Sequence, residues 1–373
     1  MLRGRVATGS LGALRSTARH SSCATPAAGS RLAALRQALQ EDDGAPAAAA
    51  APARRRKEHV RHPEWLKAPM AGGDDYQRIK KSLKSSKLAT VCQEARCPNI
   101  GECWGGKEGT ATATIMVMGD TCTRGCRFCN VKTSRNPPPL MDDEAEQVAA
   151  NIASWGVGYV VITSVDRDDI PDGGASHFAS VVREAKRLNP KLLLECLTPD
   201  FNGTSGLDGV ATVATSGLDV YAHNIETVER LQKSVRDHRA GYRESFGVLE
   251  HARRVKPSLV TKTSIMLGCG EEEAEVRQAM SDARSAGVEI FTLGQYLQPS
   301  KKHMKVARMV HPDEFEAHRL AGLEMGFKYV ASGPLVRSSY KAGEAFIEGF
   351  LRERDAERAQ QLEAMHKPKE VAS

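Results

Sequence analysis

Short apolar runs alternate with longer amphipathic segments along most of the chain. The runs are rich in β-branched and aliphatic residues and predict buried strands at 112–118, 158–163, 192–196, 218–223, 261–266 and 289–293. Apolar residues three to four positions apart predict helices at 143–155, 177–188, 244–255, 271–286 and 313–325, with a weaker segment at 208–215. The alternation indicates an α/β fold with a parallel sheet, which is either an open doubly wound sheet or a whole or partial barrel.

Polar residues recur where the predicted strands end. Acidic residues follow the first two strands, Glu195 lies in the third, Asn224 and Glu226 follow the fourth, and Gln295 follows the sixth. A helix cap or a solvated loop accounts equally well for any one of them. Because ligands of parallel α/β folds bind at the carboxyl ends of the strands, their recurrence predicts the functional site at that edge.

The charge of the chain is concentrated in its N-terminal segment. The chain has 52 Lys and Arg against 46 Asp and Glu, a formal charge of +6, and residues 1–57 hold ten of the basic residues and three of the acidic ones. The remaining 42 basic and 43 acidic residues form a nearly neutral body, without the basic stripe expected of a nucleic-acid-binding protein. No apolar run approaches the roughly 18 residues that a membrane span needs. We therefore expect neither nucleic acid nor a membrane span.

The N-terminal segment has the composition of an organelle targeting peptide. Six arginines, many Ala and Ser and no acidic residue precede Glu41, and arginines or glycines interrupt every apolar stretch that a secretory signal would need. An Ala- and Pro-rich stretch with three arginines follows at 45–57. We expect a transit peptide and linker at 1–57, with the mitochondrial matrix favoured over a plastid. A disordered tail without a targeting role is the alternative.

Six of the nine cysteines fall into two groups of three. They form C-x3-C-x2-C, the downstream triplet of Cys122, Cys126 and Cys129, and C-x4-C-x5-C, the upstream triplet of Cys92, Cys97 and Cys103. An odd total in a reducing compartment disfavours disulfides, and neither triplet has the paired ligands of a zinc site or the runs that bind haem or bacterial ferredoxin clusters. Three thiolates on a four-iron cluster leave one iron open to another ligand, which suggests catalysis.

The downstream triplet lies in GDTCTRGCRFCNV, residues 119–131, which is similar to the cluster loop of radical S-adenosylmethionine (SAM) enzymes. Together with CQEARCPNIGECW at 92–104, TSVDRDDIPDGGA at 163–175 and RSSY at 337–340, it resembles the lipoyl synthase family of that superfamily over about residues 63–350. One departure is visible. Met309 and His311 stand where the family pattern has Tyr and Thr, at positions that touch no expected ligand.

The resemblance implies a fold and a division into domains. The fold is a partial (β/α)6 barrel of the radical SAM type, similar to a TIM barrel, with extensions at both ends. The implied domains are an N-terminal extension with the upstream triplet at 58–110, a core barrel at 111–330 and a C-terminal extension with the RSSY motif at 331–373.

The resemblance also implies roles for individual residues. The downstream triplet is expected to hold a catalytic 4Fe-4S cluster whose open iron binds SAM. The upstream triplet is expected to hold an auxiliary 4Fe-4S cluster with Ser339 as its fourth, catalytically important ligand, and Ser338 is the competitor for that role. Glu195 and Asn224 are candidate contacts to SAM.

The implied reaction inserts sulfur into a saturated chain. Such C–H bonds offer no acidic proton and no leaving group, so a radical is required. In the family, cleavage of SAM gives a 5′-deoxyadenosyl radical that takes hydrogen from carbons 6 and 8 of a protein-bound octanoyl-lysine, and the auxiliary cluster supplies the sulfur. The implied partners are octanoylated carrier domains (glycine cleavage H protein and the E2 subunits of 2-oxoacid dehydrogenases), a ferredoxin-type electron donor and an iron-sulfur cluster carrier.

Two other functions remain open from the sequence. A radical SAM methylthiotransferase also carries a three-cysteine cluster ahead of the radical one, but it needs a nucleic-acid-binding region, which neither the neutral body nor the short charged tail at 351–373 provides. A non-catalytic iron-sulfur protein does not need polar residues at so many strand ends, and it would not cleave SAM.

Overall fold

The computed structural model describes Ala33, Gln37 and residues 63–67, 72–85, 88–95, 97–104, 114–155, 157–201, 206–339, 349–352 and 354. Apart from Ala33 and Gln37, these residues belong to one compact unit, His62–Ser373. Nearly all of the predicted transit peptide and linker lies outside the described residues, as does Tyr340 of the RSSY motif.

Eight strands form the main sheet, in the order β1-β2-β5-β6-β7-β8-β9-β10. They are β1 (Ala89–Thr90), β2 (Thr114–Val117), β5 (Tyr159–Ser164), β6 (Leu193–Leu197), β7 (Val220–Ala222), β8 (Val260–Leu267), β9 (Ile290–Gln295) and β10 (Tyr329–Gly333). β1 is antiparallel to β2, and every other neighbouring pair is parallel. The six predicted strands are thereby confirmed, and β10 adds a further parallel strand. A separate two-stranded sheet pairs β3 (Thr121–Cys122) with β4 (Lys132–Thr133).

The parallel strands from β2 to β10 lie in the sheet in their chain order. A doubly wound sheet reverses its strand order at a switch point, where the helices change from one face to the other. No reversal occurs here, so the order excludes the doubly wound alternative and is that of a TIM-like barrel. Among the described residues β1 and β10 do not pair with each other, so this barrel is partial.

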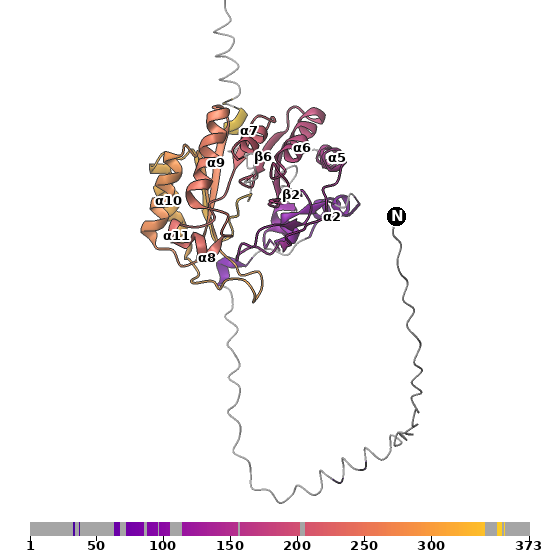
Figure 1. Cartoon of the computed structure of the whole chain (residues 1–373). Helices are drawn as coiled ribbons and strands as arrows, with labels where there is room; N and C mark the ends of the chain where they lie inside the picture. The colour runs from indigo at the N-terminus through magenta and orange to yellow at the C-terminus, as the bar shows by residue number, and fades with distance from the viewer. Residues whose placement is uncertain are drawn as a thin grey trace, which may run out of the picture. The chain divides into compact units, whose positions relative to one another are not determined.

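Six helices follow the barrel strands and cover the outside of the sheet (Figure 1). They are α5 (Glu144–Trp155), α6 (Ala175–Leu188), α7 (Asp208–Ala214), α9 (Tyr242–Val255), α10 (Glu273–Ser285) and α11 (Pro312–Glu324), and they confirm the predicted helices, including the weaker one. Shorter elements lie in the connections: η1 (Glu64–Leu66), η2 (Glu229–Leu231) and α8 (Gln232–Val235). No described helix combines the length and the apolar character that a bilayer crossing requires.

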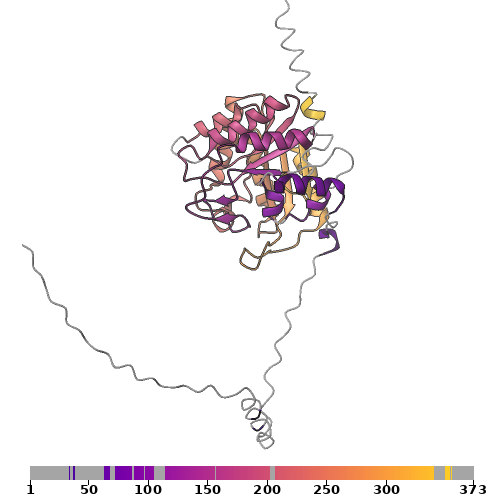
Figure 2. The same ribbon diagram turned by 90° about the vertical axis from the view of Figure 1, so that its right-hand side faces the viewer.

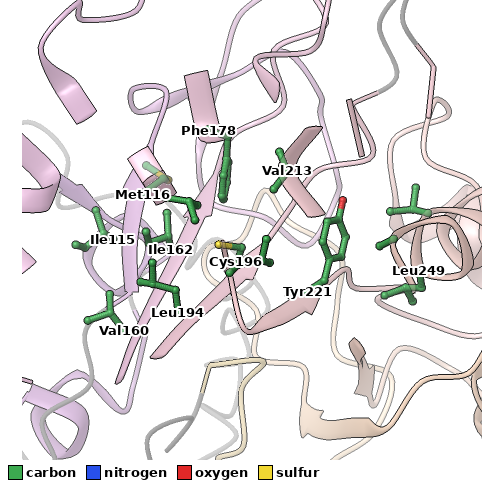
Figure 3. Packing of buried hydrophobic residues seen from close by; sticks show 14 of the residues in the cluster. Ile115, Met116, Val160, Ile162, Phe178, Leu194, Cys196, Val213, Tyr221 and Leu249 are labelled. Atoms are coloured by element: carbon green, nitrogen blue, oxygen red, sulfur yellow. The ribbon is translucent and has the colours of Figure 1, made fainter. Parts of the chain in front are cut away.

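The barrel strands β2 and β5 to β9 are buried on both faces, which explains why they read as continuous apolar runs. Alternate side chains of a strand point to opposite faces. Val160, Ile162 and Leu194 belong to the cluster that packs against the helices, beside Phe178 of α6 (Figure 3). Their neighbours along β5 and β6 belong to a second cluster, which consists of Tyr159, Val161, Leu193, Val220, Val260, Ile290 and Leu351.

The N-terminal extension lies against the first barrel strand, because its β1 pairs with β2. Its helices are α2 (Asp74–Ser85), α3 (Val91–Glu94) and α4 (Ile100–Trp104), and the indigo α2 lies on the side of the unit that faces the viewer in Figure 2. The Asn99 side chain donates a hydrogen bond to the Leu335 carbonyl just after β10. The side chain of Ser82 also donates to Asn151 of α5, at 2.7 Å. These contacts bring the segment of the upstream triplet to the edge of the barrel.

Candidate functional site

The downstream triplet lies on a loop that leaves the carboxyl end of β2. The chain turns there through two residues with left-handed φ, Met118 at 66° and Gly119 at 86°. Such a conformation is costly for methionine, and the Met118 N–H is held by the Glu144 carboxylate at 2.9 Å. The turn directs Cys122 toward the end of β5, where its sulfur accepts the backbone N–H of Asp166 at 3.3 Å.

A buried arginine fixes this loop to the ends of β5 and β6. The Arg124 guanidinium donates to both oxygens of Asp200, at 2.6 and 2.7 Å, and to Asp168 at 2.7 Å. It also lies 3.3 Å from Asp166. Burial raises the pKa of Asp166 to about 6, although the charge of Arg124 opposes the rise.

A second cation continues the network around the loop. Arg239 bonds Asp168 at 3.0 Å and Asp237 at 2.8 Å, and the Asp237 carboxylate accepts the Gly125 N–H at 2.8 Å. The Asp237 N–H in turn donates to the sulfur of Cys126 at 3.3 Å. The loop is thus held both by its side chains and by hydrogen bonds to its sulfur atoms, as expected for metal ligands that a surrounding shell orients.

The two triplets meet in one cavity of about 510 Å³. Cys122, Cys126 and Cys129 line it together with Cys92 and Cys97 of the upstream triplet. Ser338 and Ser339, from the segment after β10, line it as well. Cys103 lies on α4 and is not among the lining residues. The structure therefore brings together seven of the predicted residues that come from three separate stretches of the chain.

Burial keeps the thiols of the metal-free chain protonated. It raises the pKa of Cys122 and of Cys126 to about 12 and that of Cys92 to about 11. Cluster assembly must therefore release protons. Among the described residues, no group of three His, Cys, Asp or Glu side chains is placed to hold a single metal ion. An iron-sulfur cluster binds each thiolate through a different iron, and the cysteines of the triplets are donors of the kind that such a cluster takes.

The two candidate SAM contacts occupy different positions. Glu195 is 1% exposed and pairs with Lys262 at 2.7 Å and with the Tyr159 hydroxyl at 2.7 Å. This group lies within the barrel, and Glu195 does not line the cavity. Asn224 does line it: its Nδ2 donates to Glu226 at 3.0 Å, while its Oδ1 is buried and has no hydrogen-bond partner within the part of the chain that the structure describes.

Other residues of the site were not predicted from the sequence. Arg124 is one, and the carboxylates of Asp166 and Asp168 at the end of a predicted strand were a signal that could have indicated a cation nearby. His303 is another: its Nε2 lies 3.0 Å from the Cys129 carbonyl oxygen, and the Met304 N–H donates to the Arg127 carbonyl at 3.2 Å. A loop far along the chain therefore supports the downstream triplet.

The departure from the family pattern has a structural role. His311 is the N-cap of α11: its side chain accepts the Asp313 N–H, and Glu314 completes a capping box. Threonine is an ordinary N-cap residue, so histidine takes over the function of the residue expected there. Neither Met309 nor His311 lines the cavity.

Comparison with known proteins identifies the family. Residues 116–283 match the radical SAM superfamily, and residues 12–97 match the N-terminal domain of lipoyl synthase. The chain is 58% identical over 315 residues to the mitochondrial lipoyl synthase of Culex quinquefasciatus, which covers 84% of this chain and 82% of that protein. The chain belongs to the lipoyl synthase family.

Other lipoyl synthases agree with this assignment. The mitochondrial lipoyl synthase of Danio rerio is 58% identical over 82% of this chain and 76% of its own length. That of Oryza sativa subsp. indica is 54% identical over 92% of this chain and 90% of its own. A crystal structure of Streptococcus suis SuiB bound to S-adenosylmethionine aligns with a TM-score of 0.45 at 11% identity, over 58% of this chain and 49% of that one, a likeness too weak to carry an argument.

Membership in the lipoyl synthase family confirms several of the predictions. The chain is a radical SAM enzyme that uses SAM and 4Fe-4S clusters, and it is mitochondrial like its relatives. The match to the N-terminal lipoyl synthase domain begins at residue 12, within the segment assigned to targeting. The predicted boundary at residue 57 stays a prediction.

Proposed function

We propose that the chain inserts two sulfur atoms, at carbons 6 and 8 of a protein-bound N6-octanoyl-lysine. The downstream triplet holds the cluster that binds SAM, and the upstream triplet with Ser339 holds the auxiliary cluster that donates the sulfur. The observation that carries this proposal is the single cavity, because it is lined by all of the downstream cysteines, two of the upstream ones and Ser339. Reaction at one substrate carbon requires both clusters to be within reach of it.

The chemistry of the donors supports the same assignment. When bound, SAM and the reduced cluster supply the radical chemistry that amino-acid side chains cannot. Thiolates are the usual ligands of iron-sulfur clusters, and a harder serine oxygen is a weaker partner for iron. A cluster held in this way is suited to losing sulfur.

The apolar part of the cavity lining is suited to an alkyl chain. Met116, Phe128, Val165, Leu197 and Ile265 are among its apolar lining residues. Its volume is in the ordinary range for small-molecule sites. We assign to these side chains the binding of the octanoyl group and the exclusion of water from the reactive carbon.

Polar residues of the cavity lining are assigned to SAM. Asn224 is one of them: its Oδ1 has no hydrogen-bond partner among the described residues, and its Nδ2 donates to Glu226. We retain Asn224 as a SAM contact, whereas the buried pair with Lys262 favours a structural role for Glu195. The domain limits at 58–110, 111–330 and 331–373 are retained as proposals, although β10 runs across residue 330.

The substrates and partners are assigned by class. The relatives are named lipoyl synthases, and we propose that this chain acts on octanoylated lipoyl carrier domains, namely glycine cleavage H protein and the E2 subunits of 2-oxoacid dehydrogenases. A ferredoxin-type protein supplies the electrons, and an iron-sulfur cluster carrier restores the auxiliary cluster.

Mass spectrometry of the carrier tests this function. The anaerobically reconstituted chain is incubated with reductant, SAM and octanoylated carrier, and the expected product has two C–H hydrogens replaced by two sulfurs. Cys269→Ala serves as the control, because this cysteine does not line the cavity. A carrier that keeps its octanoyl group while 5′-deoxyadenosine accumulates contradicts the proposal.

A further inference from the structure

The hydroxyl of Thr114 contacts the serine that is proposed as the fourth ligand of the auxiliary cluster. Thr114 begins β2 and is 1% exposed. Its Oγ1 donates a hydrogen bond to the Ser339 Oγ at 2.9 Å, across 225 residues of sequence. A residue outside every cysteine motif therefore contacts a proposed ligand of the auxiliary cluster.

A serine side chain is free to change its rotamer unless a partner holds it. Thr114 supplies such a partner from a strand of the barrel, which is more rigid than the loop that carries Ser339. Because Thr114 is the donor, the Ser339 oxygen keeps a lone pair for a metal. We propose that Thr114 is a positioning residue that aims Ser339 at the iron left without a thiolate by the upstream triplet.

This inference rests on the proposed function, since it takes Ser339 as the fourth ligand. It also gives a physical reason for the choice between two adjacent serines. Ser338 and Ser339 both line the cavity, but the hydroxyl donor of β2 is bonded to Ser339. The RSSY motif alone does not distinguish the two.

The test measures how fast a chelator removes iron from the auxiliary cluster. The full-length chain carries Ala at all three positions of the downstream triplet, so that only the auxiliary cluster is present. The chelator is added together with ferricyanide, which takes the one electron needed to form the oxidised three-iron cluster, and that cluster is followed by electron paramagnetic resonance. A net hydrogen bond is worth about 1 kcal/mol, so Thr114→Val is expected to speed the loss of the fourth iron about fivefold. Thr114→Ser keeps the donor and should restore the wild-type rate.

A matched control separates positioning from general destabilisation. Thr261 is another buried strand threonine, whose hydroxyl donates to the Gly287 carbonyl at 3.1 Å, and it does not line the cavity. Thr261→Val should leave the rate of iron loss unchanged. Should Thr114→Val prevent folding, Thr114→Ala takes its place.

The outcomes distinguish this inference from the function on which it rests. If Ser339→Ala accelerates iron loss and Thr114→Val does not, Ser339 is a ligand and the role of Thr114 is wrong. If neither variant changes the rate, Ser339 is not a ligand and both assignments fail. An equal acceleration by Thr261→Val also overturns the inference.

Discussion

Replacing Arg124 by Met tests how the loop of the downstream triplet is held. The guanidinium is 4% exposed and makes two hydrogen bonds to Asp200 and three to Asp168, the latter at 2.7, 3.1 and 3.2 Å. Methionine has a similar length and no charge. The variant therefore leaves buried carboxylates without their cation.

Most of the expected loss of stability comes from Asp200. Asp168 keeps Arg239 at 3.0 Å and the Thr123 hydroxyl at 2.7 Å. Asp200, whose side chain is 5% exposed, has both oxygens bonded to Arg124. Removing one partner of a buried ion pair costs about 3–5 kcal/mol, and we expect Arg124→Met to lower the free energy of unfolding by about 3 kcal/mol. Arg124→Lys should lower the free energy of unfolding by less, although one ammonium group cannot replace a planar guanidinium that donates hydrogen bonds to two carboxylates.

Urea unfolding of the metal-free chain measures this loss, and iron analysis of the reconstituted chain measures its effect on the site. We expect the downstream cluster to be depleted and the auxiliary cluster to be retained, since the displaced loop carries only the downstream triplet. The control is Arg187→Met, which removes an exposed pair with Glu184. Equal unfolding midpoints and equal iron contents for Arg124→Met and Arg187→Met would refute the reasoning.

Three further predictions concern the ligands and the barrel interior. Replacing the downstream triplet by Ala should leave about four irons and abolish 5′-deoxyadenosine production. Replacing the upstream triplet should also leave about four irons but spare SAM cleavage. If the second variant loses cleavage while its radical cluster is intact, the division of roles is contradicted. Ser339→Ala should keep SAM cleavage but lose sulfur insertion, and Ser339→Cys should release sulfide more slowly. Ser338→Ala should reduce sulfur insertion much less. Mass spectrometry of the product measures the insertion, and an inactive Ser338→Ala variant reverses the assignment. Glu195→Gln should destabilise the fold by breaking the buried pair with Lys262 while the KM for SAM stays unchanged, and a large rise in that KM would restore Glu195 as a contact.

The sequence predicted the parallel strands and their helices because most of the strands are buried on both faces and the helices have one apolar side, whereas the barrel was implied only by the family resemblance. It left open how the strands are ordered, since periodicity within an element carries no information on which elements pair. β10 was missed for a local reason. Only Val330 of its five residues is buried, so the segment lacks the apolar run that marked the other strands.

The cluster ligands of the site could be predicted from the spacing of the cysteines, whereas the residues that only folding brings to the site could not. The cysteine triplets are recognisable from their intervals alone. Glu195 was predicted as a SAM contact at the end of the third strand, but it is the central residue of β6 and does not line the cavity. The roles of Arg124, Thr114 and His303 arise from contacts between segments far apart in the chain, which no local pattern encodes.

The most direct test of the central claim is the origin of the inserted sulfur. The chain is reconstituted with iron and sulfide labelled with a heavy sulfur isotope, freed of excess sulfide, and allowed to turn over once on octanoylated carrier with SAM and reductant. The account predicts that both sulfurs of the product carry the label, and that none is inserted when the upstream triplet is replaced by Ala. Product formed with unlabelled sulfur, or at the normal rate without the upstream triplet, would contradict the account.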